Sequence, residues 1–194
     1  MNEKYSEVLA ALEAPNSDYT LLKNSKGVTV MAKATKRGFQ LLSKFTIQKT
    51  ATDFVRLFED KAELARVDSN VESITVIDQS ELYNVNYTVM KKVFGFTQRD
   101  VVICSKRFES PHSTTIVSAS VECPGYEPRT DLVRIQLHLG GIHLEDTAEG
   151  CSVTYVSESD LGTKVPLVVL RKLAAVSMTQ FARTLQRALQ QTKP

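Results

Sequence analysis

Hydrophobic positions near the start of the chain recur with a helical period and then with a period of two. Apolar residues three and four apart between Asn2 and Ala14 predict a short amphipathic helix. The alternating segments Tyr19–Lys23 and Val28–Ala32 flank the turn residues Asn24 to Gly27, which predicts a hairpin. The alternation from Phe39 to Ile47 predicts a third strand.

A short helix is expected next, because Thr52 and Asp53 can cap a segment that contains Phe54 and Phe58. Runs rich in Val, Ile, Thr and Tyr then predict six more strands, at Val71–Ile77, Leu82–Met90, Asp100–Phe108, Thr114–Val121, Leu132–Leu139 and Ser152–Ser157. From Pro166 to Gln190 the pattern is helical without glycine or a further proline, and this helix would be about 35–40 Å long.

This order of elements predicts a single α+β domain over residues 1–194. Its main layer would be a curved antiparallel sheet of about nine strands, wrapped around the long C-terminal helix, with short helices inserted after the third strand. A single helix cannot fill the concave side of so wide a sheet. The pattern alone therefore points to an internal cavity.

Composition and charge narrow the possible functions. The 24 Lys and Arg residues against 22 Asp and Glu leave a net charge of +2, without the basic excess typical of nucleic-acid binding. Three widely spaced cysteines form no CxxC pair, which favours a reducing compartment. The N-terminus has acidic residues where a signal peptide needs basic ones, and no apolar stretch is long enough to span a bilayer. We therefore expect a cytoplasmic protein.

Catalytic and metal-binding motifs do not emerge from the sequence. His112, His138 and His143 lack the convergent spacing of metal ligands, so no metal site is expected. No nucleophile elbow, P-loop or dinucleotide fingerprint occurs. The carboxylate pairs Glu145-Asp146 and Glu158-Asp160 border turns and are interpreted as solvated charges. We expect no cofactor and no enzymatic activity.

Several short segments occur in the order and spacing of one known family. They are Gly27-Val28-Thr29-Val30 after Tyr19, Asp68-Ser69-Asn70-Val71, Arg99-Asp100-Val101-Val102, Val133-Arg134, Asp160-Leu161-Gly162, Val165-Pro166 and Phe181-Ala182-Arg183-Thr184-Leu185. From about Tyr19 to Leu189 the chain resembles the START family, the lipid-transfer domains related to the steroidogenic acute regulatory protein. It departs from the family pattern because both expected tryptophans are absent, one being replaced by Val67, and because Gly141 stands where a large aromatic residue is expected.

The resemblance implies a helix-grip fold in which the sheet and the C-terminal helix enclose a lipid tunnel. The strands before and after the loop 90–98 would line its wall with Leu82, Asn84, Asn86, Val101, Ile103 and Ser105. The long helix would add Leu170, Ala174, Ser177, Met178 and Phe181.

Asn86 and Ser105 fall where sterol carriers of the family place a buried acid and a buried arginine. Two neutral groups cost less to bury than an ion pair when they are hydrogen-bonded. They could bind a hydroxyl, amide or ester group of a ligand, or they could simply bond the neighbouring backbone. A sterol, a phospholipid, a sphingolipid and a fatty acid all remain candidates.

The loop before Arg99 combines Lys91 and Lys92 with Val93, Phe94 and Phe96. The lysines suit an anionic membrane surface, and the aromatic rings could enter the headgroup region. Alternatively, the phenylalanines close the tunnel from inside. Both roles are compatible with a lid made of this loop and the C-terminal helix.

The sequence therefore predicts a monomeric lipid carrier whose partners are one lipid and, transiently, a membrane surface. Nucleic acid is not an expected partner. A lipid-sensing module of the same fold is the main alternative. A helix-grip enzyme of the cyclase or hydrolase type has less support, because the expected wall positions contain no acid–base pair.

Overall fold

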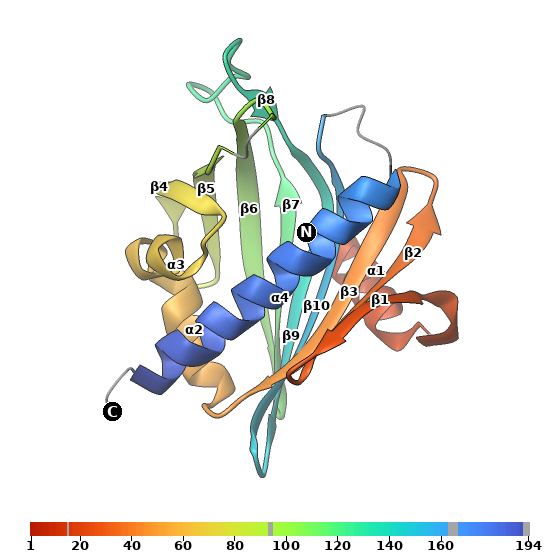
Figure 1. Ribbon diagram of the computed structural model, residues 1–194. Coiled ribbons are helices and arrows are strands. Elements are labelled where there is room, and N and C mark those ends of the chain that lie inside the picture. The colour runs from red at the N-terminus through yellow and green to blue at the C-terminus, as the bar shows by residue number, and fades with distance from the viewer. Residues whose placement is uncertain (15, 93–94, 163–166, 192–194) are drawn as a thin grey trace.

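The structure of the chain is a computed structural model that describes residues 1–14, 16–92, 95–162 and 167–191. Within these residues ten strands form one sheet, which curves around a long helix (Figure 1). The strands are β1 (Thr20–Ser25), β2 (Val28–Thr35), β3 (Gly38–Ile47), β4 (Val71–Gln79), β5 (Tyr83–Met90), β6 (Arg99–Ser110), β7 (Ser113–Ser120), β8 (Val133–Arg134), β9 (Gln136–Thr147) and β10 (Gly150–Asp160).

The helices cover both faces of the sheet. They are α1 (Asn2–Glu13), the 3-10 turn η1 (Asn16–Asp18), α2 (Ala51–Glu59), α3 (Lys61–Val67) and α4 (Leu167–Gln191). Helix α4 crosses the concave face diagonally and packs against β1, β2 and β3, while α1 lies on the opposite face against β7, β9 and β10 (Figure 1). The predicted α+β helix-grip architecture is confirmed.

The strands follow the order β1-β2-β3-β10-β9-β7-β6-β5-β4, and each neighbouring pair is antiparallel. The predicted hairpin turn between β1 and β2 is present. Lys26 and Gly27 both have positive φ there, 53° and 76°, as a two-residue hairpin loop requires.

The short helical region divides into two helices with separate caps. Helix α2 begins after Thr50, whose side chain accepts a hydrogen bond from the backbone N–H of Asp53, and the Asp53 carboxylate accepts one from Thr50 in return. The predicted cap at Thr52 was therefore two residues too late. Asp60 ends α2 and caps α3 by accepting from the backbone N–H of Glu63.

The predicted strand Leu132–Leu139 was wrong at both ends. Val133 and Arg134 form the short strand β8, which pairs in parallel with the start of β6. This edge of β6 is open to β8 because the pairing of β6 with β7 ends at Ser120. Strand β9 then runs without a break from Gln136 through Gly140 and Gly141 to Thr147.

Neighbouring side chains approach the backbone of Gly141 closely. A Cβ atom on Gly141 would lie 2.6 Å from Cγ1 of Val8 in α1 and 2.9 Å from Cγ1 of Val156 in β10. Gly141 therefore permits the close approach of α1 to the convex face, where Val8 is fully buried.

The main core lies between α4, the short helices and the concave face. Its α4 residues are Ala175, Met178, Ala182, Leu185, Ala188 and Leu189. Among the described residues, no helix is long and apolar enough to cross a membrane.

Substituting Gly141 by alanine should displace α1 and lower the free energy of unfolding by roughly 1–3 kcal/mol, because the added methyl overpacks the contact with Val8. Chemical denaturation measures this change. In a Val8→Ala background the same substitution should cost less, since the closest clashing atoms are gone. Equal costs in both backgrounds would contradict this account of the glycine.

Candidate functional site

A row of polar side chains crosses the concave face of the sheet at β5, β6 and β7. Asn84 lies opposite Ser105, and Ser105 lies opposite Ser118. Directly paired residues point to the same face of a sheet, as do residues two apart in one strand. Ser118 therefore shares the face of Ile116, which belongs to the core beneath α4.

Most polar atoms of this row bond one another. The Nδ2 group of Asn86 donates to Oδ1 of Asn84, and the hydroxyls of Ser105 and Ser118 are 2.8 Å apart. Oδ1 of Asn86 is buried and has no hydrogen-bond partner within the described residues. Such an orphan acceptor is costly in an apolar interior, and a ligand donor would remove the cost.

The other predicted wall residues differ in their surroundings. On β6, Val101 is buried and Ile103 is half-buried, and both share the face of Ser105. Leu82 lies outside β5, which begins at Tyr83, and its side chain is 47% exposed. The structure thus gathers five of the six predicted sheet residues on the inner face and leaves Leu82 in a bend at its border.

The buried stripe of α4 is turned by about one residue from the predicted face. Of the five predicted α4 residues, Met178 is buried, whereas Leu170, Ala174, Ser177 and Phe181 are half-buried. The deepest positions include Ala175 and Ala182, whose small side chains allow the helix backbone to approach the sheet. The half-buried residues flank this contact line.

Charged groups lie at one end of the polar row. Arg107, two residues after Ser105 on the same face, forms an ion pair with Glu59 at the end of α2. Lys61, only 7% exposed, donates to the Phe58 carbonyl oxygen at 2.7 Å and lies over the Phe58 ring. Burial lowers the pKa of the Lys61 ammonium to about 8, although the nearby Glu59 carboxylate acts in the opposite direction.

The predicted lid loop is anchored at its base. The backbone N–H of Lys91 donates to the Asn70 carbonyl at 2.7 Å, and the Gln98 side chain donates to the Met90 carbonyl at 3.0 Å. Lys91 and Lys92 are exposed. Val93 and Phe94 lie outside the described residues.

Arg99 joins this loop to the segment that leads toward α4. Its guanidinium lies over the Phe96 ring at 5.4 Å, and Nη1 donates to the Thr97 carbonyl. Nε donates to the carbonyl oxygen of Leu161 at 3.3 Å. Phe96 is half-buried in this arrangement.

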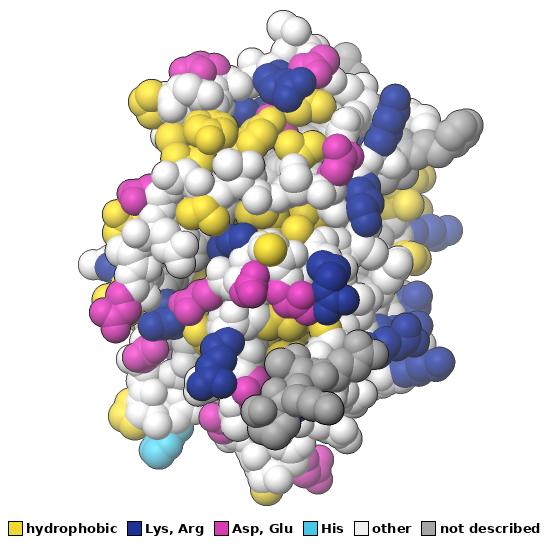
Figure 2. All heavy atoms as spheres, turned by 90° about the vertical axis from the view of Figure 1, so that its left-hand side faces the viewer, with side chains coloured by type: hydrophobic (Ala, Val, Ile, Leu, Met, Phe, Trp, Pro, Cys, Tyr) yellow, Lys and Arg dark blue, Asp and Glu magenta, His cyan; other side chains and the backbone are white. Residues whose placement is uncertain are grey.

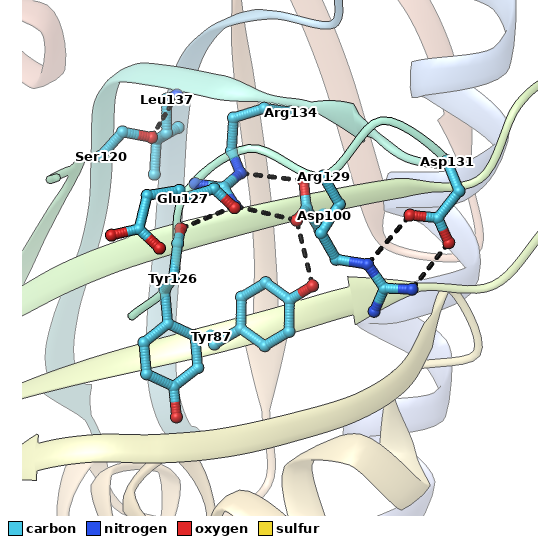
Figure 3. A network of polar contacts seen from close by, with 9 residues as sticks. All are labelled: Tyr87, Asp100, Ser120, Tyr126, Glu127, Arg129, Asp131, Arg134 and Leu137. Atoms are coloured by element: carbon cyan, nitrogen blue, oxygen red, sulfur yellow. Dashed lines mark hydrogen bonds and ion pairs between the residues drawn. The ribbon is translucent and has the colours of Figure 1, made fainter. Parts of the chain in front are cut away.

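Asp100 organises the opposite, convex side of the same strand (Figure 3). Its carboxylate is fully buried and accepts from Nε and Nη2 of Arg134 at 2.8 and 2.9 Å. The Tyr87 hydroxyl donates to it at 3.0 Å, and burial together with this bond raises the pKa of Tyr87. Arg134 also donates to the Tyr126 carbonyl, so the network fastens the segment before β8 onto β6.

Sequence reasoning identified Arg99-Asp100 and Val133-Arg134 as family-like segments but missed that Asp100 and Arg134 pair. The usable signal was an aspartate in an apolar strand, which needs a cation when it is buried. The described residues contain no group of three side chains placed to hold a metal ion.

The comparisons with known proteins agree with this architecture. The model of the START domain family matches residues 1–194. The chain therefore belongs to the START domain family, as its sequence predicts. No curated protein matches it significantly.

Solved structures share the fold at low sequence identity. Human STARD10 is 20% identical with a TM-score of 0.86, covering 97% of this chain and 79% of the other. Human StAR-related lipid transfer protein 5 is 19% identical with a TM-score of 0.87, covering 97% and 94%. The STAR-related lipid transfer protein fragment of Xanthomonas axonopodis is 19% identical with a TM-score of 0.80, covering 90% and 99%.

Arg134→Gln should lower the free energy of unfolding by about 3–5 kcal/mol, because it leaves the fully buried Asp100 carboxylate without its cation. The matched control is Arg66→Gln, which breaks the exposed Arg66–Glu63 pair of α3 and should cost less than about 1 kcal/mol. Denaturant titrations of both variants test the difference. Similar losses would show that the Asp100 network does not anchor this region.

Proposed function

We propose that the protein is a lipid carrier that holds one lipid between α4 and the concave face of the sheet, acting as a monomer in the cytoplasm. Membership of the START domain family supports this function. Two of the structural neighbours, the human protein 5 and the Xanthomonas fragment, are named as StAR-related lipid transfer proteins. The observation in this chain that carries the proposal is the buried, unpartnered Oδ1 of Asn86 among bonded neutral side chains.

In this proposal the lipid's polar group lies against the inner row of amides and hydroxyls. Asn86 would accept a hydrogen bond from a hydroxyl or amide of the ligand, and its own bond to Asn84 would hold the acceptor in place. A sterol hydroxyl or a sphingolipid amide fits that acceptor. A phospholipid headgroup would instead turn toward Arg107 and Lys61 at the charged end of the row.

The apolar part of the ligand would lie beside Val101, Ile103 and the half-buried positions Leu170, Ala174 and Phe181 of α4. Amide and hydroxyl groups do not provide the perturbed acid and base that hydrolysis or cyclisation requires. The inner row therefore supports binding rather than catalysis.

Exchange with a membrane requires the interior to open. We propose that the loop 90–98 and α4 form the lid. The base of the loop is held at Asn70 and Met90, so in this proposal the lid pivots about its base. Arg99 would couple that movement to α4 through the Leu161 carbonyl.

Asn86→Leu tests the proposal. It removes the orphan acceptor with little change in volume, but it also removes the donor to Oδ1 of Asn84, so the two effects oppose each other and the melting temperature of the lipid-free protein should stay close to wild type. Uptake of radiolabelled sterol or ceramide from vesicles should fall about tenfold, as expected for the loss of about 1.4 kcal/mol from one hydrogen bond.

Thr115→Val is the matched control, because it removes a buried hydroxyl from the opposite face of the sheet. It should leave lipid uptake unchanged, although it costs stability through the lost contact with His143. If Asn86→Leu took up both lipids at the wild-type level, this result would contradict the assignment of Asn86 to the ligand site.

A further inference from the structure

One face of α4 points away from the sheet and carries exposed apolar residues in its first half. Val169, Leu173 and Val176 follow one another at spacings of four and three, so they share this face. Their side chains are 42%, 46% and 53% exposed. Three adjacent aliphatic residues at such exposure form an apolar stripe rather than scattered surface positions.

The same face becomes basic in the second half of the helix. Arg183 and Arg187 continue the spacing, being seven and eleven residues after Val176. Together with Lys26 of the β1–β2 turn they line an open groove of about 610 Å³. An adjoining hollow of about 300 Å³ is lined by Val176, Lys23 and both arginines, which makes the apolar stripe and the basic groove one continuous surface.

The cations of this groove have no carboxylate partner in the part of the chain that the structure describes. Within the described residues, Lys23, Lys26, Arg183 and Arg187 form no ion pair, and Glu149 is the one acid that lines either hollow. Arg183 donates through Nη2 to the Ser25 hydroxyl at 2.9 Å, while its buried Nε has no partner among the described residues. The groove therefore has an unbalanced positive charge.

This concentration of charge is local. The face on the β4 and α3 side shows acidic and basic side chains interspersed, whereas basic side chains gather along the right-hand edge of Figure 2, the side on which α4 lies in Figure 1. A chain with a net charge of only +2 thus presents these four cations next to exposed aliphatic residues.

We propose that the outward face of α4, together with the β1–β2 turn, docks onto a membrane that contains anionic lipids. The cations contact the headgroups, and Val169, Leu173 and Val176 enter the interface beside them. From Val169 to Arg187 the face is about 27 Å long, enough to lie along a bilayer surface. An acidic protein would complement only the basic groove, whereas an anionic membrane complements both the basic groove and the apolar stripe.

This surface is distinct from the lid loop. Lys91 and Lys92 directly follow β5, whose end pairs with the start of β6, where β8 also pairs. The β1–β2 turn and the C-terminal half of α4 lie toward the opposite end of the sheet from β8 (Figure 1). The α4 surface holds the domain on the membrane, and the loop has its role in opening the interior.

Sedimentation with vesicles of phosphatidylcholine, with and without phosphatidylserine, tests the proposal. Wild-type protein should bind the anionic vesicles at low salt and lose binding as salt is added. The double variant Lys26→Gln with Arg187→Gln removes two exposed cations, and its partition coefficient should be about 30-fold lower, from about 1 kcal/mol per cation.

The matched control is Lys36→Gln with Arg37→Gln in the β2–β3 turn, which also removes two exposed cations but lies at the other end of β2 from the groove and should change the partition coefficient much less. A third variant, Leu173→Ser with Val176→Ser, should weaken binding at every salt concentration. Equal losses in the two charge variants would overturn the proposal, and so would equal binding to neutral and anionic vesicles. Binding of a soluble acidic polypeptide in preference to the vesicles would assign the groove to a protein partner and would overturn it as well.

Discussion

The structure depends on one constraint, which is that a single long helix must close the concave face of a wide sheet. Nine strands in sequence span about 40 Å, whereas a helix with its side chains is only about 10–12 Å across. Helix α4 packs against β1, β2 and β3, and α2 and α3 add cover beside it. The inner faces of β5, β6 and β7 are nevertheless buried, and they carry the neutral polar row of Asn84, Asn86, Ser105 and Ser118.

The same constraint explains the uneven surface of α4. Small residues such as Ala175 and Ala182 let the helix approach β1 to β3, and this contact fixes which side of the helix faces outward. The outward side then carries both aliphatic and basic residues, because neither group is needed for the core. In the proposed carrier, the inner face of this helix would hold the lipid and its outer face would meet the membrane.

Periodicity was sufficient for most of the fold, because alternation and helical spacing report burial directly. It failed where a neighbouring element decides the structure. Gly141 is typical of a break in a strand, yet it pairs with Val156 and Val117 within β9, and a Cβ there would clash with Val8 of α1. The inner positions of β5 and β6 were predicted from the family resemblance. The Asp100–Arg134 pair was not, since its partners are 34 residues apart and belong to strands joined in parallel. The exposed stripe of α4 was also missed, because a rotation of one residue interchanges half-buried and outward positions.

The most direct test of the central claim is native mass spectrometry of the protein after incubation with liposomes of mixed composition. A carrier that encloses one lipid between α4 and the sheet should show a single adduct of one lipid per monomer, and its mass would identify the lipid class. Unmodified protein after exposure to sterols, glycerophospholipids and sphingolipids would contradict the account.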